Sequence, residues 1–329
     1  ASFVCRTADR ALLVFRDVWI GRGMRADVLL RNLTDQPRIV AVRVDVDADL
    51  ADVFAVKEGR SKAVPVVRAA GDGAVSITND HRRRGLVVRS AGATADPEGA
   101  LWWRAEVPPR SEWAACMELS AVRGDGELIP RHRCGLPPQQ AVPATRQAGW
   151  ERRLPRLRTD VAGLGHVVER SGEDLGALRI FDPDHPDEAV IAAGAPWYMT
   201  LFGRDSILTA WMALLVEPRL AIAVVRTLAR LQGRKDDPAT EEQPGRILHE
   251  IRLSRGPSLA LGQGDIYYGT VDATPLFVML VHELWRWGVP LDELRPLLPA
   301  VDAALGWVAG PGDPDGDGYV EYASRSPDG

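Results

Sequence analysis

The spacing of apolar residues changes once along this chain, and the change limits the folds that the chain can adopt. Up to about residue 123, apolar and polar side chains alternate, as in residues 40–46 and 113–121. This pattern is typical of strands with one buried face. After Ser206, apolar residues recur every three or four positions, as in helices with one apolar side. The sequence therefore predicts an N-terminal antiparallel β-sandwich followed by a helical domain.

Four helices are predicted in the second half from their apolar spacing, and glycines mark several of their ends. They are centred on residues 207–215, 220–231, 277–287 and 301–308. Gly233 and Gly288 follow two of these segments, where glycine commonly ends a helix. Thr274 is predicted to cap the third helix, with Pro275 in its first turn. Helices that follow one another in pairs predict stacked α-hairpins.

The region between the two halves has no single periodicity. Prolines at positions 137, 138 and 143 argue against regular structure there. Apolar residues within 150–170 are spaced for one helix. The sequence thus predicts a sandwich over 1–123, a linker with a helix over 124–192, and a helical domain over 193–329.

Composition and charge exclude several classes of protein. The formal net charge of the 329 residues is −5, so the chain has no basic footprint for nucleic acid. No apolar run approaches the ~20 residues that span a bilayer. Cys5, Cys116 and Cys134 are few, odd in number and without metal spacing, which predicts reduced core thiols. We expect a cytoplasmic protein without nucleic-acid or membrane partners, and the sequence leaves its oligomeric state open.

Residues 193–206 join aromatic side chains to an adjacent ion pair. The aromatic residues are Trp197, Tyr198 and Phe202, and Arg204 and Asp205 follow at the start of a helix. Sugars suit such a segment, because their C–H faces lie on rings and their hydroxyls bind charged groups. A buried loop with a structural Arg-Asp pair explains the segment equally well.

Long polar loops between the predicted helices carry further candidates. They cover residues 233–250, 254–273 and 311–329, and loops of this length are often functional. One contains His249 and Glu250, and the next contains Tyr268 and Asp272 just before a helix. The alternatives are a solvated turn for the first pair and a helix-dipole role for Asp272. If the loops share one end of a helical array, they converge on one cavity.

Three aspartates in the last loop resemble the start of a calcium-binding loop. They are Asp313, Asp315 and Asp317. An EF-hand loop requires a bidentate Glu at its twelfth position, which here is Ser324. A tight Asp/Gly turn is the favoured interpretation, so we expect no metal and no cofactor.

Several blocks together resemble one family of enzymes. Residues 193–206, 237–242, 244–252, 268–277 and 315–322 occur in the order found in the bacterial glycogen-debranching-like, or amylo-alpha-1,6-glucosidase-like, family, and 51–57 looks like a variant of its N-terminal signature. This six-hairpin glycosidase resemblance implies a β-sandwich followed by an (α/α)6 barrel, and inverting hydrolysis of an α-glucan or α-glucoside. It implies that one sugar site is lined by Trp197, Tyr198, Phe202, Arg204, Asp205, His249, Glu250, Tyr268 and Asp272.

The chain departs from the family pattern near residue 329. The family's presumed general acid follows a turn like that at 326–329, and its presumed base comes later still. Glu321 is the last carboxylate near the acid's position and is only a minor candidate. Twelve helices need on the order of 250 residues, whereas about 125 follow Gly203. We therefore expect a truncated barrel that is inactive alone.

Two alternatives to a hydrolase remain open. One is a non-catalytic carbohydrate-binding or scaffold protein of the same fold. The other is a helical barrel that carries out a different sugar reaction, such as epimerisation. In each case the expected partner is an oligosaccharide or glucoside.

Overall fold

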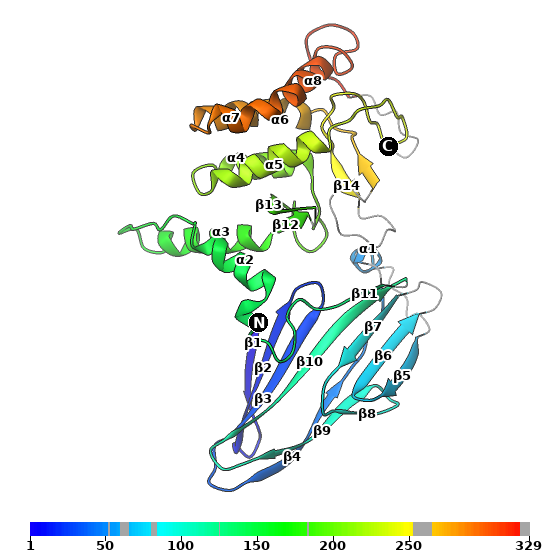
Figure 1. The fold of residues 1–329 in the computed structure, drawn as a ribbon, viewed down its shortest axis with the longest axis vertical. Coiled ribbons are helices and arrows are strands. Elements are labelled where there is room, and N and C mark those ends of the chain that lie inside the picture. The colour runs from blue at the N-terminus through cyan, green and yellow to red at the C-terminus, as the bar shows by residue number, and fades with distance from the viewer. Residues whose placement is uncertain are drawn as a thin grey trace. The chain divides into compact units, whose positions relative to one another are not determined.

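The computed structural model divides the chain into two compact units, Ala1–Ala148 and Gly149–Gly329 (Figure 1). It describes residues 1–51, 53–59, 66–79, 84–124, 126–182, 184–252 and 265–322. Residues 124–192, predicted as a linker, are shared between the two units. We describe each unit by itself.

The first unit consists of two antiparallel sheets. The larger has the strand order β1 (Ser2–Arg6), β2 (Leu12–Ile20), β3 (Met24–Asn32), β10 (Glu112–Arg123), β7 (Arg84–Arg89), β6 (Ala74–Asn79) and β5 (Val67–Gly71), with β11 (Gly126–Leu128) paired to β10. The smaller has the order β4 (Arg38–Asp45), β9 (Ala100–Val107) and β8 (Thr94–Ala95). The short helix α1 (Val53–Lys57) lies between β4 and β5 in sequence, and the 3-10 helix η1 (Pro138–Gln140) follows β11.

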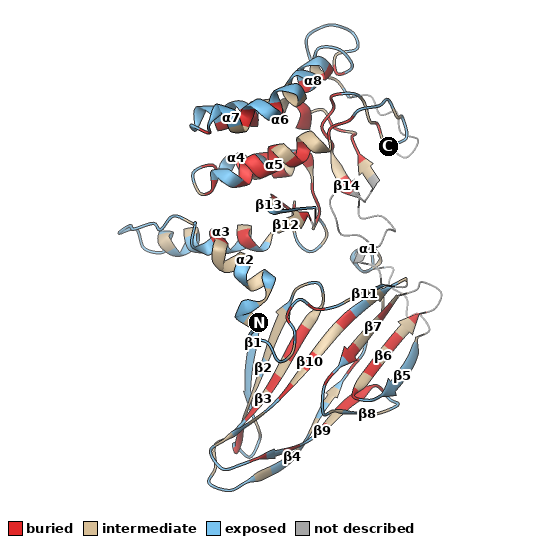
Figure 2. Ribbon diagram, viewed as in Figure 1, coloured by how far each residue is buried: buried red, intermediate tan, exposed pale blue. Residues whose placement is uncertain are grey.

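Alternating side chains from both sheets form one hydrophobic core. Leu30 of β3 and Met117 of β10 come from the larger sheet, and Leu101 and Trp103 of β9 come from the smaller. Figure 2 shows the resulting alternation of buried and exposed residues along the strands. The period of two therefore places one face of each sheet inward, and the predicted β-sandwich is confirmed.

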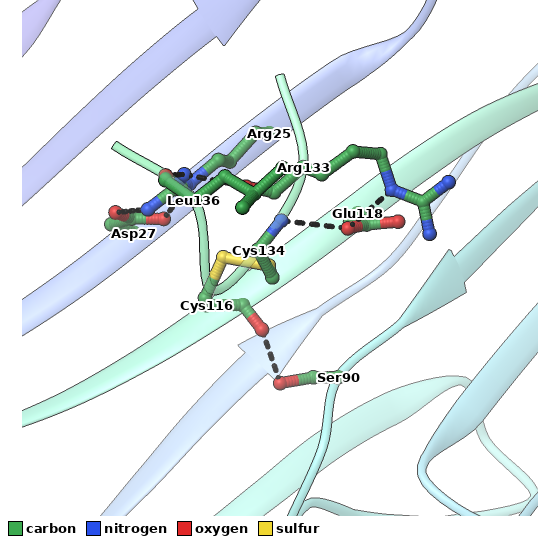
Figure 3. Close-up of a disulfide and its surroundings, with 8 residues drawn as sticks. All are labelled: Arg25, Asp27, Ser90, Cys116, Glu118, Arg133, Cys134 and Leu136. Atoms are coloured by element: carbon green, nitrogen blue, oxygen red, sulfur yellow. Dashed lines mark hydrogen bonds and ion pairs between the residues drawn. A yellow bond between two sulfur atoms is a disulfide. The ribbon is translucent and has the colours of Figure 1, made fainter. Parts of the chain in front are cut away.

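A disulfide joins Cys116 of β10 to Cys134 (Figure 3). The prediction that all three cysteines are reduced is therefore wrong for this pair, although Cys5 is free and exposed. The segment carrying Cys134 is also held by Arg25, which donates from Nη1 to the carbonyl oxygens of Arg133 and Leu136 at 2.7 Å each. The cytoplasmic location rested in part on reduced thiols and stays a prediction.

Removal of this disulfide should measurably weaken the first unit. We expect Cys116→Ala with Cys134→Ala to lower the free energy of unfolding by about 3 kcal/mol, because a bond across 18 residues restricts the unfolded chain. Urea unfolding with and without a reductant measures the effect. Cys5→Ala is the control and should unfold as the wild type does. A wild-type midpoint that the reductant leaves unchanged would contradict the pairing.

The second unit is mainly helical. Its elements are α3 (Leu164–Ala177), the hairpin β12 (Arg179–Asp182) and β13 (His185–Ile191), α4 (Gly203–Met212), α5 (Pro218–Arg230), the ribbon β14 (Glu250–Arg252) and β15 (Asp265–Tyr267), α6 (Ala273–Arg286), α7 (Leu291–Leu294), the 3-10 helix η2 (Arg295–Leu297) and α8 (Leu298–Val308). None of the helices in the described ranges is long and apolar enough to cross a bilayer.

Two helix boundaries differ from the sequence prediction. The single helix expected within 150–170 is replaced by α2 (Val142–Glu151) and α3. Pro143 lies in the first turn of α2. Backbone N–H groups in the first turn make no hydrogen bond within the helix, so proline is tolerated there although it lacks an N–H. Thr274 lies inside α6 instead of capping it, and its Oγ1 accepts a bond from the N–H of Ile247 at 2.9 Å.

The core of the second unit is built from the apolar sides of the helices. Helix α4 packs on α5 and α6, and α6 packs on α8. Ile207, Leu228 and Phe277 are fully buried in this core. The helical periodicity marked the inward face of α5 correctly, because Leu220, Val224 and Leu228 are all buried. In the other predicted helical segments it was only partly right, since Leu215, Trp287 and Leu305 are 78%, 48% and 48% exposed.

Candidate functional site

A close backbone approach at Gly203 assembles the candidate site. The Gly203 N–H donates to the carbonyl oxygen of His249 at 2.8 Å. A Cβ at this position would lie 2.1 Å from the carbonyl oxygen of Leu248. Beside this contact, Phe202 forms a β-bridge with Glu250, and Glu250 pairs with Tyr267 across the β14–β15 ribbon. The start of α4 and both strands of the ribbon are therefore adjacent.

Three charged residues from two helix N-termini form the ionic part of the site. Arg204 lies 3.1 Å from Asp272 and 3.8 Å from Asp205, measured between nitrogen and oxygen. Asp272 immediately precedes α6, and Arg204 and Asp205 lie in the first turn of α4. Their side chains are 33–45% exposed, so the group is accessible to a ligand. A carboxylate is also favourable at a helix N-terminus.

The carboxylate of Asp272 is held on both oxygens. Thr270 donates from its hydroxyl to Oδ1 at 2.5 Å, and Arg204 donates to Oδ2 at 3.1 Å. Burial raises the pKa of Asp272, but these two bonds and the charge of Arg204 together hold the pKa below its ordinary value. Asp272 is therefore an anion at neutral pH.

The hydroxyl of Thr270 should contribute stability that depends on pH. Thr270→Val keeps the shape and removes the bond to Asp272, which should lower the free energy of unfolding by about 1 kcal/mol at neutral pH. Because the folded pKa is lowered, the difference is fully present above the ordinary value of 3.8 and disappears as the pH falls through the folded pKa.

Urea unfolding at pH 7 and at about pH 2 measures this difference, because the lower value lies well below the ordinary carboxyl pKa and reaches the range of the lowered folded pKa. Thr270→Ser keeps the hydroxyl and should behave as the wild type at both values. A Thr270→Val difference of the same size at both pH values would contradict the ionic bond.

Four rings form a row next to the ionic group. Tyr198 and Phe202 have centroids 6.0 Å apart, Phe202 and His249 are 5.7 Å apart, and His249 and Tyr267 are 6.0 Å apart. Each pair meets edge to face. Nδ1 of His249 is buried and has no hydrogen-bond partner within the described residues. The row therefore combines apolar ring surface with one buried polar atom that has no partner among the described residues.

Two predicted site residues stand apart from this cluster. Tyr268 is buried in the helical core and donates its hydroxyl to the carbonyl oxygen of Leu231 at 2.9 Å. Burial raises the pKa of Tyr268 to about 12. Trp197 lies within the tight hairpin closed by Gly194 and Tyr198 and is partly buried. The structure thus gives Tyr268 a core role and places Trp197 in the hairpin that precedes the row in sequence.

Glu321 lies in the acidic loop and not in the Arg204 group. The oxygens of Asp313, Asp315 and Asp317 lie within 4.8 Å of one another, and all three accept backbone N–H groups in the manner of a tight turn. Burial and these three carboxylates raise the pKa of Glu321. Among the described residues, Arg204 pairs with Asp205 and Asp272, and no hydrogen bond or ion pair joins it to Glu321. Ser324, the turn at 326–329 and residues 254–264 of the preceding loop lie outside the described residues.

Sequence reasoning missed a buried polar cluster behind the row. Arg246 donates to the carbonyl oxygens of Glu241 at 2.9 Å and Thr270 at 3.0 Å, and its guanidinium lies over the ring of Trp307. Oε1 of Glu241 accepts from the hydroxyl of Tyr267 at 3.3 Å. In the sequence, Glu241 stands among polar residues, a pattern that is typical of a solvated turn. Only the structure, in which Glu241 is 1% exposed, reveals the buried cluster.

Comparison with known proteins finds one family that is similar to the first unit. Residues 3–118 match the family described as the N-terminal domain of (some) glycogen debranching enzymes. The match covers most of the sandwich. It confirms the resemblance to the glycogen-debranching family for this part of the chain.

Three solved structures show partial similarity. They are a putative kojibiose phosphorylase from the human microbiome (9% identity, TM-score 0.36, 84% of this chain), the Slr1438 protein from Synechocystis sp. PCC 6803 (12%, 0.25, 37%) and a heparan sulfate lyase HepC mutant from Pedobacter heparinus (12%, 0.23, 35%). The chain spans 39%, 60% and 19% of their respective lengths, less than two thirds in each case. No curated protein matches the chain in sequence.

Proposed function

We propose that this protein is a carbohydrate-active protein of the glycogen-debranching type that binds the terminal glucose of an α-glucan or α-glucoside for hydrolysis. Arg204, Asp205 and Asp272 would bind the sugar hydroxyls, and Phe202 would lie against a sugar face. The observation that carries the proposal is the meeting of the two helix N-termini at Arg204, directly beside the ring row. Charged groups next to exposed ring surface are what a pyranose requires.

The arrangement of the helices supports a finer proposal about the fold. Consecutive helices α4 and α5 pack together, and α6 packs on both α4 and α8. Hairpins packed in this way are the units from which an (α/α)6 barrel is built, and we propose that this unit is part of such a barrel. The candidate site lies at the helix ends where the long loops begin.

Hydrolysis with inversion needs one carboxylic acid and one carboxylate on opposite sides of the scissile bond. Asp272 and Asp205 both contact Arg204, which favours binding of sugar hydroxyls over proton donation. We therefore assign these aspartates to recognition. The proposed general acid and base are other residues of the whole protein.

Calorimetric titration with deoxynojirimycin, a glucose-shaped amine, tests recognition. We expect saturable binding to one site, because its hydroxyls match the Arg204 group and its cation is attracted by Asp205 and Asp272. Galactose-shaped deoxygalactonojirimycin is the matched control and should bind more weakly. No saturable binding of either compound would refute the proposed site.

The engagement of both aspartates with Arg204 also favours a second candidate, a non-catalytic carbohydrate-binding protein. Incubation of the whole protein, including the proposed acid and base, with maltose, isomaltose and glycogen separates the two. Released glucose supports a hydrolase, whereas saturable binding without release supports the binding protein.

A further inference from the structure

The ring row ends at a buried carboxylate that the proposed glucose site does not use. The hydroxyl of Tyr267 lies 3.2 Å from that of Tyr322, and both donate to Oε1 of Glu241, at 3.3 and 3.4 Å. Tyr267 is 9% exposed, whereas Tyr322 is 48% exposed. The row therefore runs from the exposed Tyr198 through the partly buried Phe202 and His249 to the buried Tyr267, whose hydroxyl meets that of the exposed Tyr322.

The burial and the backbone conformation of Glu241 both cost folding free energy. Glu241 is 1% exposed, and its carboxylate faces the guanidinium of Arg246 at 3.7 Å. Burial of an ion pair costs desolvation energy that apolar side chains would avoid. Its backbone φ is +55°, a left-handed conformation that costs a non-glycine residue about 1 kcal/mol or more. Strain and buried charge at one residue indicate a functional role for its orientation.

The contacts of Glu241 determine which atoms the two tyrosines present. The single phenol proton of Tyr322 has Oε1 of Glu241 and the Tyr267 oxygen as its acceptors, so the phenol oxygen of Tyr322 keeps a lone pair available to accept a bond from a ligand hydroxyl. Because Tyr322 is 48% exposed, its aromatic side chain can also contact a ligand. A sugar unit uses both features. Because Phe202 is two residues from Arg204 and contacts the same row, the row leads from the Arg204 group to Tyr322.

We propose that Tyr322 and Tyr267, oriented by Glu241, form a second sugar position beyond the Arg204 group. This inference rests on the proposed function, and it makes the ligand a chain of linked sugars with one unit at the Arg204 group and another at Tyr322. Glu241 is a positioning residue here, since it acts through the two hydroxyls and contacts no sugar itself.

Titration of the whole chain with glucose and with maltotriose tests the second position. We expect the wild type to bind maltotriose at least tenfold more tightly than glucose. Tyr322→Phe removes the phenol oxygen and should reduce this ratio about fivefold or more, since one hydrogen bond contributes roughly 1 kcal/mol. Glucose affinity should stay within about twofold, a difference of under 0.5 kcal/mol.

Two further variants separate positioning from folding. Glu241→Gln should lower the same ratio as Tyr322→Phe does, and the double variant should lower it no further, because both act on one hydroxyl. Tyr319→Phe changes a tyrosine in the same loop that is 75% exposed and should leave the ratio unchanged. If Glu241→Gln fails to fold, the exposed Tyr322→Phe still decides the result.

The outcomes distinguish this inference from the function on which it rests. Glucose binding with an unchanged ratio in Tyr322→Phe, or with no preference for maltotriose, overturns the second position alone. No binding of glucose, maltotriose or deoxynojirimycin overturns both proposals. An equal loss in Tyr319→Phe and Tyr322→Phe would also overturn the second position.

Discussion

Gly203→Ala is expected to destabilise the helical unit by roughly 3–5 kcal/mol, the range of severe packing substitutions. The new Cβ would lie 2.1 Å from the carbonyl oxygen of Leu248 and 3.0 Å from the Cβ of Ala273. The first of these neighbours is backbone and cannot rotate away. Relief requires α4 to move from the segment that carries His249, which breaks the hydrogen bond between Gly203 and His249.

Thermal unfolding measures this effect, and a fall in Tm of roughly 10 °C is expected for a domain of this size. Gly194→Ala is the matched control, because a Cβ there has no heavy atom within 4 Å and its φ is not left-handed. It should change stability by less than about 0.5 kcal/mol. Equal stability of the two variants would show that α4 and residue 248 are not in close contact.

Asp205→Asn is expected to weaken binding of deoxynojirimycin by about 10- to 100-fold, because a charge-assisted hydrogen bond to a ligand contributes roughly 1.5–3 kcal/mol. The fold should survive, since the Asp205 side chain is 38% exposed and lies 3.8 Å from Arg204. Arg204 keeps its closer partner, Asp272. In a catalytically active form, kcat/KM should fall by orders of magnitude if this bond strengthens in the transition state.

Calorimetry measures the change in affinity, and Asp302→Asn controls for loss of one negative charge. Asp302 lies on an exposed position of α8 and should leave the affinity unchanged. Unchanged binding by Asp205→Asn would remove this residue from the sugar site. Weaker binding together with a large fall in Tm would instead indicate a structural role.

The folds of the two units could be predicted from local patterns because burial follows the geometry of each element. Alternation along β4 and β10 places every second side chain in the sandwich core. The apolar stripe of α5 places Leu228 in the helical core. Neither inference required knowledge of which elements are neighbours.

The details of the site could not be predicted, because they depend on contacts between distant segments. Residues 267 and 268 are adjacent and both are tyrosine, yet Tyr268 enters the hydrophobic core and the hydroxyl of Tyr267 bonds to Glu241. Successive side chains of an extended segment point to opposite sides, so their roles depend on which side the core occupies. The pairing of Cys116 with Cys134 likewise depends on the path of residues 130–136 along β10.

The nearest partner of Arg204 illustrates the difference between what local sequence patterns predict and what contacts between distant segments decide. Its sequence neighbour Asp205 is 3.8 Å away, whereas Asp272 lies 3.1 Å away from a position 68 residues later. The sequence by itself determined the order of a β-sandwich and a helical unit, and the residue types that gather at the helix ends. The tertiary structure alone decided which of these residues meet. Side chains of adjacent residues on a helix point in different directions, whereas the packing of α4 against α6 brings the N-termini of these two helices together.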